Sequence, residues 1–136
     1  MSGVSSNAKG KHIVRSDDGQ CVLWVGAVDD LWQLGKPRGL GGPWENSAVT
    51  ANQPSDPYLM TGYDHKSLQL SHDSATPISF RVEVDITGTG KWVGYKEFSV
   101  APSQTFEYRF PEAFTAYWVR VSADHDCRAM AIFRYE

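Results

Sequence analysis

The sequence predicts an all-β domain, an antiparallel two-sheet β-sandwich or jelly roll with minimal helix. Short segments that alternate apolar and polar residues recur through the second half of the chain, and Gly, Pro, Asn or Asp turn signals separate them. Apolar residues at helical spacing are almost absent from the chain. A closed barrel remains an alternative, because the sequence does not determine the order of the strands.

Composition limits the classes of partner. The chain has 136 residues, which is the size of one domain, and 41% of them are hydrophobic, which is enough for a core. Thirteen Lys and Arg against 16 Asp and Glu give a net charge of −3. This balance argues against nucleic-acid binding, and no apolar run approaches the length of a membrane span. We therefore expect no nucleic-acid partner and no membrane insertion.

The beginning of the chain is small and polar. Residues 1–16 predict a flexible lead-in, followed by a single β-sandwich domain over residues 17–136. Cys21 to Val28 is an apolar run of strand length, and Asp29 or Asp30 is expected to cap one helical turn that Gly35 ends. No apolar signal segment is visible, so the chain is expected to be either not exported or a piece of a larger protein.

Two stretches rich in Gly and Pro follow. Residues 35–44 (GKPRGLGGPW) contain four glycines and two prolines, which predicts neither a regular strand nor a helix. Residues 52–57 (NQPSDP) form a second stretch of this kind. Together they predict a long irregular region, and long ordered loops in compact domains are often functional.

From residue 58 onward the pattern is β. Residues 77–86 form the clearest strand, which points every second residue to the core: Ile78, Phe80, Val82, Val84 and Ile86. A turn at residues 88–90 leads into residues 91–100, where the alternation slips near Gly94 and predicts a β-bulge. Residues 105–110 alternate again, and residues 116–123 and 127–135 predict a final hairpin.

Both cysteines lie on the apolar side of their predicted strands. Cys21 shares the parity of Leu23, and Cys127 shares that of Ala129. If the first and last strands are neighbours, a disulfide between them is geometrically possible. The alternative is two buried, reduced thiols.

Catalytic and metal-binding signatures are weak. His65, His72 and His125 each lie beside an aspartate, but no HxH or HExxH spacing occurs and neither cysteine belongs to a CxxC pair. No GxSxG motif or phosphate-binding loop is present. We therefore expect no metal, no cofactor and no catalytic residue, although whether the protein is an enzyme stays open.

The irregular region carries the residue types that hold sugars. Aromatic rings stack on the C–H faces of a sugar, while planar polar groups bind its hydroxyls. The predicted ligand-binding residues are Arg38, Trp44, Asp56, Tyr58, Tyr63, Asp64 and His65. The alternative is that Trp44 and Tyr58 only anchor the loops to the sandwich. Four other aromatic residues lie inside predicted strands and are expected in the core: Trp24, Phe80, Trp118 and Phe133. The sequence does not decide whether Trp92 faces the core or the solvent.

The second half of the chain resembles a family. Residues 77–135, with the closing segments AYWVRVSAD and CRAMAIFRY, look like the jelly-roll carbohydrate-binding and related accessory modules of secreted bacterial proteins that act on glycans. The resemblance implies an extracellular or periplasmic setting and a glycan or small polar ligand. It leads us to expect a non-catalytic binding module that belongs with other domains of a larger parent protein. The alternatives are a small glycan lyase or hydrolase that uses Asp64 and His65, and a structural or protein-interaction domain.

Overall fold

The structure, a computed structural model, describes residues 7, 9–27, 29–30 and 35–136. The chain folds as two compact units, which divide between Gly35 and Lys36. The boundary that the sequence suggested, between residues 16 and 17, is not where the units divide. The end of the predicted strand at Val28 and most of the predicted helical turn before Gly35 lie outside the described residues.

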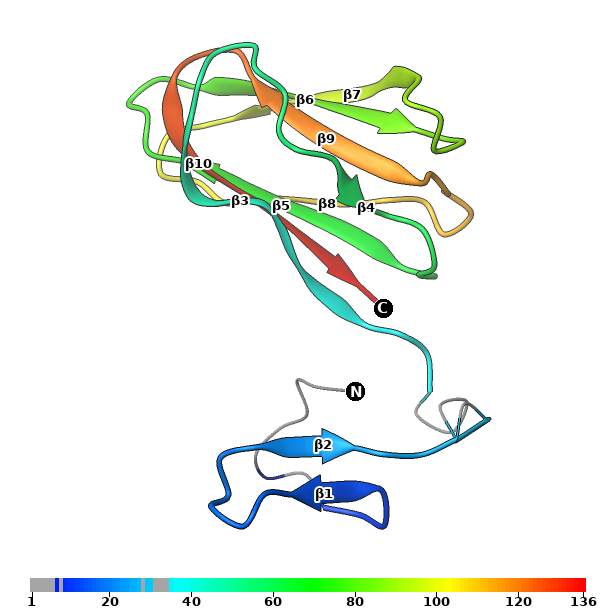
Figure 1. Cartoon of the computed structure of the whole chain (residues 1–136). Coiled ribbons are helices and arrows are strands. Elements are labelled where there is room, and N and C mark those ends of the chain that lie inside the picture. Colours follow the sequence, from blue (N-terminus) through cyan, green and yellow to red (C-terminus); the bar gives the residue numbers. More distant parts are fainter. Residues whose placement is uncertain (1–6, 8, 28, 31–34) are drawn as a thin grey trace. The chain divides into compact units, whose positions relative to one another are not determined.

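The N-terminal unit contains a short hairpin (Figure 1). Strand β1 (Ile13–Arg15) pairs antiparallel with β2 (Val22–Trp24), so that Ile13 lies opposite Trp24. The turn between them includes Gly19, whose φ of 69° is one that glycine adopts without strain. Part of the segment that was predicted to be a flexible lead-in is therefore a strand, and the predicted strand at residues 21–28 is only three residues long.

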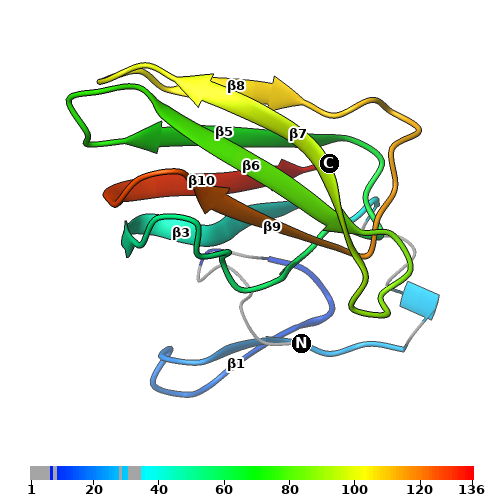
Figure 2. The same cartoon turned by 90° about the horizontal axis from the view of Figure 1, so that it is seen from above.

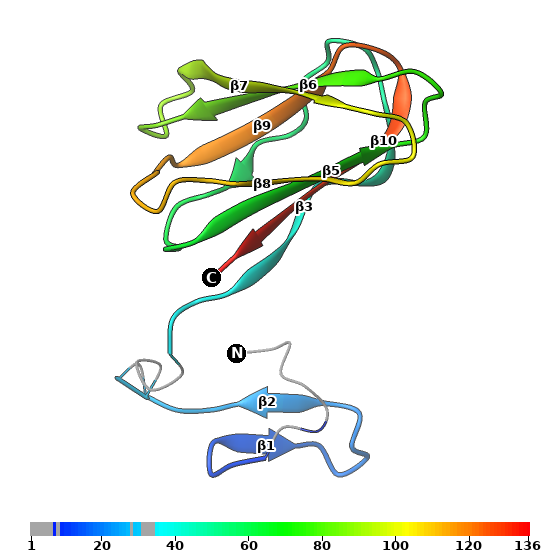
Figure 3. The same cartoon turned by 180° about the vertical axis from the view of Figure 1, so that it is seen from behind.

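The C-terminal unit is a β-sandwich of two four-stranded antiparallel sheets, which confirms the predicted fold class (Figures 1 and 3). Sheet I has the strand order β3 (Gly39–Val49), β10 (Cys127–Tyr135), β5 (Lys66–His72) and β8 (Phe106–Arg109). Sheet II has the order β4 (Tyr58–Leu59), β9 (Trp118–Ala123), β6 (Ile78–Asp85) and β7 (Trp92–Val100). Seen from above, strands of the two sheets cross at an angle (Figure 2).

The core lies between the two sheets and follows the predicted alternation. On β6, the side chains of Ile78, Phe80 and Val82 are fully buried. Leu68 and Phe133 are equally buried on sheet I. Strands with one face in the core and one in water give this pattern, which is why the sequence predicted β6 well.

Strand β3 corrects the prediction that residues 35–44 are irregular. Residues 39–49 form an 11-residue strand that pairs with β10, with register shifts between Ala129 and Ala131 and between Ala131 and Phe133. A Cβ atom at Gly42 would collide with the carbonyl group of Ala131, so the glycine allows close approach of the two backbones. Pro43 is tolerated because β3 lies at the edge of sheet I.

The predicted final hairpin is also wrong. Strand β9 belongs to sheet II and β10 to sheet I, so the chain crosses between the layers at residues 124–126. Strand β10 pairs with β3 and β5, whereas β2 pairs with β1 in the other unit. The first and last predicted strands are therefore not paired with each other among the described residues.

Cys21 and Cys127 are both free thiols, and the predicted disulfide is not formed. Cys21 is exposed and Cys127 is half-buried, so neither thiol is as buried as expected.

The end of β6 differs from the prediction by one residue. Asp85 is 1% exposed, although the alternation placed it in solvent, and Ile86 is 55% exposed, although it was expected in the core. The Asp85 carboxylate accepts hydrogen bonds from the backbone N–H groups of residues 87–90, at 2.7–3.3 Å. The strand ends here because the hairpin loop folds over this carboxylate.

Candidate functional site

A polar groove of about 460 Å³ lies on the face of sheet II that points away from sheet I. Its floor consists of β9, β6 and the adjoining part of β7. Its lining contains Asn52, Pro54, Ser79, Arg81, Glu83, Glu97, Arg120, Ser122, Ala123 and Asp124. We name it the sheet II groove and take it as the candidate site, because it is concave and polar and is formed by side chains of three paired strands.

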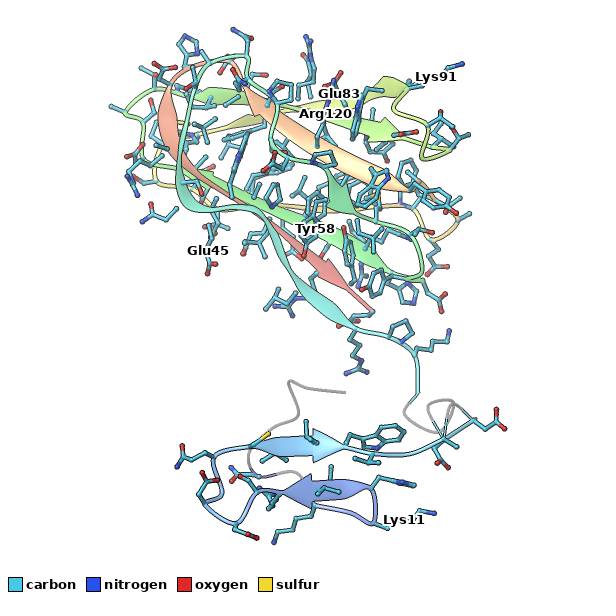
Figure 4. The ribbon with its side chains drawn as sticks, viewed as in Figure 1. Lys11, Glu45, Tyr58, Glu83, Lys91 and Arg120 are labelled. Carbon is cyan, nitrogen blue, oxygen red and sulfur yellow. The ribbon has the colours of Figure 1, made fainter. Side chains whose placement is uncertain are left out.

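Arg120 lines the groove opposite Glu83, at the end away from Ser79 and Asp124. Its Nε donates a hydrogen bond to Oε2 of Glu83 at 2.8 Å, because the register of β6 and β9 places the two residues opposite each other. Their side chains are 24% and 20% exposed, so the pair is largely removed from water. Figure 4 shows both residues on the outer side of sheet II. A charged pair held in this way has a fixed geometry.

Trp92 packs beneath the same guanidinium group. The central carbon of that group lies 4.3 Å from the centroid of the Trp92 ring, which is within the range of a cation–π interaction. A guanidinium group that is fixed by both Glu83 and Trp92 keeps its remaining N–H donors in constant directions. This arrangement suits recognition of a ligand with several closely spaced hydroxyl groups.

A β-bulge turns Trp92 to the groove side. The pairing of β6 and β7 shifts between Val82, which faces Lys96, and Glu83, which faces Gly94. Without the extra residue, Trp92 would share the parity of the buried Phe98 and point into the core. The bulge predicted near Gly94 is therefore confirmed, and it answers the question that the sequence left open about Trp92.

A second charged pair lies beside the first. Arg81 Nε donates to Oε1 of Glu97 at 2.8 Å across β6 and β7, and these side chains are 61% and 58% exposed. Two guanidinium groups and two carboxylates thus lie on neighbouring strands of one face. The groove runs along β6 from Ser79 to Glu83, a distance of roughly 14 Å at strand rise, so it is longer than a single sugar ring.

The connection from β3 to β4 forms one wall of the groove. The backbone N–H of Asn52 donates to the carbonyl of Ala123 at 2.7 Å, and the N–H of Ser55 donates to that of Val121 at 2.8 Å. These bonds hold residues 52–55 against the edge of β9. Part of the Pro-rich segment that the sequence singled out therefore does line a concave surface.

Asp124 closes one end of the groove. Its Oδ1 accepts a hydrogen bond from the backbone N–H of Ser79 at 2.9 Å and lies 3.0 Å from Nδ1 of His125. Desolvation raises the pKa of Asp124, but the bonds from His125 and Ser79 outweigh it, so the pKa lies below its ordinary value. The carboxylate is therefore charged at neutral pH and ties β9 to β6.

None of the seven residues that the sequence predicted as ligand-binding lines this groove. The structure does bring the two predicted segments together elsewhere. A Cβ atom at Gly39 would lie 3.3 Å from the Tyr63 hydroxyl oxygen, and one at Gly41 would lie 2.6 Å from that of Tyr58. The two segments that carry the predicted ligand-binding residues, 38–44 and 56–65, thus do meet, at the sandwich end near Tyr135.

The tyrosines at this meeting point turn inward. Tyr58 stacks on Phe133 with ring centroids 5.6 Å apart, and Tyr63 stacks on Tyr135 at 4.5 Å. Figure 4 shows Tyr58 between the two sheets. Burial raises the pKa of the Tyr58 phenol, and the nearby Tyr63 adds to this effect. Both tyrosines are half-buried parts of the packed end of the sandwich.

Trp44 is a core residue and not a ligand platform. Its side chain is only 7% exposed, and its ring centroid lies 6.5 Å from that of Phe80 on the opposite sheet. The prediction failed because residues 39–49 form a strand, which points Trp44 between the sheets. Trp118 shows the reverse error: it was expected in the core, but it is half-buried, and the alternation that buries Val119 and Val121 directs it outward.

The polar members of the predicted site are dispersed. Asp64 forms a salt bridge with Lys36, and this hydrogen bond lowers the pKa of its carboxyl group. The backbone N–H of His65 donates to the carbonyl of Glu136 at 2.8 Å. Arg38 is exposed and lines a separate shallow pocket with Leu40 and Glu136, whereas Asp56 is exposed in the connection before β4. These residues do not form one site.

Among the residues that the structure describes, no three His, Cys, Asp or Glu side chains are grouped so that they could hold a metal ion. No helix in the described part of the chain has the length and apolar character needed to cross a membrane.

Sequence reasoning missed Arg81, Glu83, Glu97 and Arg120. A signal was present, because the alternation of residues 77–86 already places Arg81 and Glu83 together on the polar face of one strand. Their partners come from β7 and β9, and the sequence does not state which strands are neighbours.

Comparison of the chain with known protein families, with curated proteins and with solved structures finds no match. The sheet II groove therefore has to be interpreted from its own geometry. It combines planar donors and planar acceptors on a rigid sheet, with a tryptophan packed against one of the guanidinium groups, and this arrangement is suited to hydrogen bonding with a polyhydroxylated ligand.

Proposed function

We propose that the protein is a non-catalytic carbohydrate-binding module and that the glycan lies in the sheet II groove. One observation carries the proposal. Two Arg–carboxylate pairs, Glu83 with Arg120 and Arg81 with Glu97, lie side by side on the outer face of a β-sheet, each with a 2.8 Å hydrogen bond. Paired in this way, the groups keep free N–H donors and carboxylate oxygens at fixed positions.

The chemistry of sugars fits such a surface. A vicinal diol presents two hydroxyl groups, each of which both donates and accepts a hydrogen bond. A guanidinium group can donate to one hydroxyl oxygen while a neighbouring carboxylate accepts from the next. Because the sheet backbone and the ion pairs already restrict these side chains, little conformational entropy is lost when the ligand binds.

In this proposal the module belongs with a larger secreted protein and works in an extracellular or periplasmic setting. Its role is to hold a glycan near other domains of the parent. The proposal replaces the predicted site around Trp44 with the sheet II groove but keeps the class of ligand.

A glycan array followed by titration calorimetry tests the proposal. The exposed pair is the best place to intervene, since an exposed ion pair contributes only about 0–1 kcal/mol to stability. Arg81→Ala and Glu97→Ala should each weaken glycan binding at least about tenfold, which is the loss of about 1.4 kcal/mol. The melting temperature should change little.

Arg109→Ala is the matched control, because Arg109 is an exposed arginine on β8 of the opposite sheet. It should leave glycan binding unchanged. Absence of binding to any glycan, or equal losses in Arg81→Ala and Arg109→Ala, would contradict the proposal. Release of new reducing ends or unsaturated products from a polysaccharide would identify a hydrolase or lyase instead, and a protein ligand without glycan binding would identify an interaction domain.

A further inference from the structure

We propose that the sheet II groove selects uncharged oligosaccharides over anionic ones, an inference that rests on the glycan-binding function proposed above. The observation behind it is the charge balance of the groove. Its lining contains two guanidinium groups, on Arg81 and Arg120, and three carboxylates, on Glu83, Glu97 and Asp124, so its net charge is −1. A groove that favours uronates or sulfated sugars needs the opposite balance.

Both guanidinium groups already have an anionic partner. Arg81 is paired with Glu97 and Arg120 with Glu83, each through Nε at 2.8 Å. Arg120 also lies over the Trp92 ring. A carboxylate on a sugar would therefore have to displace a protein carboxylate that is close, well aligned and, for Glu83, largely removed from water.

The carboxylates of the groove also discriminate through hydrogen bonding. An ionised carboxylate only accepts hydrogen bonds, whereas a hydroxyl group both donates and accepts. The oxygens of Glu83 and Glu97 that are not engaged by Nε of the arginines can accept from sugar hydroxyls. Facing a uronate, the same oxygens meet a second set of acceptors that carries the same charge.

The third carboxylate extends this effect to the end of the groove. Asp124 is charged at neutral pH, because its bonds from Ser79 and His125 lower its pKa. The imidazole of His125, which is bonded to this carboxylate, is mostly exposed. An anionic ligand that extends along β6 to Ser79 therefore meets the negative charge of Asp124 at that end of the groove. The two Arg–Glu pairs along the rest of the groove supply no net positive charge.

Matched ligands that differ only by oxidation of C6 in each sugar residue provide the test. The probes are β-1,4-linked mannose and glucose tetrasaccharides and the corresponding mannuronate and glucuronate tetrasaccharides, titrated calorimetrically into the whole protein. The uncharged member of a pair should bind at least about tenfold more tightly than its uronate. Its affinity should change less than about twofold between about 50 and about 500 mM NaCl, since no net ion pairing is formed.

The variant Glu97→Gln tests whether the Arg81–Glu97 pair causes the preference for the uncharged ligand. It removes one negative charge and frees Arg81, so the preference for the uncharged ligand should shrink by several-fold. Glu107→Gln, an exposed glutamate on β8 of the opposite sheet, is the matched control and should leave the preference unchanged.

Tighter binding of a uronate than of its uncharged counterpart, or binding that weakens strongly with salt, would overturn the charge selectivity while leaving the glycan-binding function intact. If Glu97→Gln and the wild-type protein prefer the uncharged ligand over its uronate equally, the Arg81–Glu97 pair is not the cause of that preference. If no probe and no arrayed glycan binds, the proposed function itself fails, and the selectivity fails with it.

Discussion

The Oδ2 atom of Asp85 accepts a hydrogen bond from the backbone N–H of Gly90 at 2.7 Å, across the loop that joins β6 to β7. Its Oδ1 atom accepts from Thr87, Gly88 and Thr89 at 2.9–3.3 Å. One carboxylate thereby satisfies the donors of a whole hairpin loop. The loop in turn removes the carboxylate from water, so the two groups depend on each other.

Replacement of this carboxylate should destabilise the sandwich. In Asp85→Asn, one carboxylate oxygen becomes an N–H₂ group that faces backbone donors, so the loop N–H groups bonded to that oxygen lose their acceptor. The melting temperature should fall by at least about 5 °C. Asp56→Asn, at an exposed aspartate whose carboxylate has no hydrogen bond among the described residues, should change it little. Similar melting temperatures for both variants would contradict this account.

The same carboxylate should make stability depend on pH in the acidic range. Desolvation raises the pKa of Asp85, but the four backbone N–H donors outweigh it, and the pKa lies below its ordinary value of 3.8. The stabilisation is therefore complete above about pH 3.8 and is lost as the pH falls through the folded-state pKa. The difference in melting temperature between wild type and Asp85→Asn should narrow below about pH 4, as calorimetry at several pH values can show.

Gly42 should tolerate no side chain. A Cβ atom there would collide with the carbonyl group of Ala131 on β10. Strand β10 cannot move away, because it also pairs with β5. Gly42→Ala should lower the free energy of unfolding by about 2–3 kcal/mol or prevent folding. Gly94→Ala should be nearly neutral in denaturant titrations, because a Cβ atom at Gly94 meets no atom within 4 Å. A Gly42→Ala protein as stable as Gly94→Ala would show that β3 and β10 are not closely paired there.

Trp44 should contribute to stability and not directly to ligand binding. Trp44→Ala creates a cavity beside Phe80 and should cost about 3–5 kcal/mol of unfolding free energy. Leu40→Ala, on the same strand but at a side chain that is 71% exposed, should cost little by comparison. Urea titrations can measure both. A stable Trp44→Ala protein with a selective loss of glycan binding would restore the site that the sequence suggested.

The thiols should both react without prior reduction. Intact mass after alkylation in denaturant, with no reductant present, should show two adducts on every chain, because Cys21 and Cys127 are free. In the folded protein, Cys21 should react first. Burial, together with the charges of Asp73, Asp124 and Asp126, raises the pKa of the Cys127 thiol and lowers its reactive thiolate fraction. A mass with no adducts would mean that the predicted disulfide exists after all.

The parts of the fold that the sequence predicted are those in which one strand face is buried. The alternation from Ile78 to Val84 identified the core residues of β6, because successive side chains of a strand point to opposite faces and only the apolar face is buried. Gly39–Val49 escaped prediction because its glycines were interpreted as turn residues, whereas Gly42 allows two strands to approach closely. The assignment of β9 and β10 to different sheets depends on long-range pairing, which sequence proximity does not reveal.

The candidate site was harder to predict than the fold. The irregular region around Trp44 and Tyr58 drew attention because it concentrated aromatic and polar residues in a short stretch. The sheet II groove instead takes single residues from separate strands, such as Arg81, Glu97 and Arg120. Only strand order and the bulge at Gly94 bring them together with Trp92, and of these the sequence indicated the bulge alone.

The position of β3 has a consequence for synthesis of the protein. Strand β3 lies at the edge of sheet I, and β10 is its only strand partner in the described part of the chain. A ribosome makes residues 39–49 long before residues 127–135, so a nascent chain carries an unpaired strand with an apolar face until its last strand emerges. Sheet pairing over such a separation is slow, and an exposed strand invites aggregation. During translation, this segment is therefore where we expect chaperones to bind.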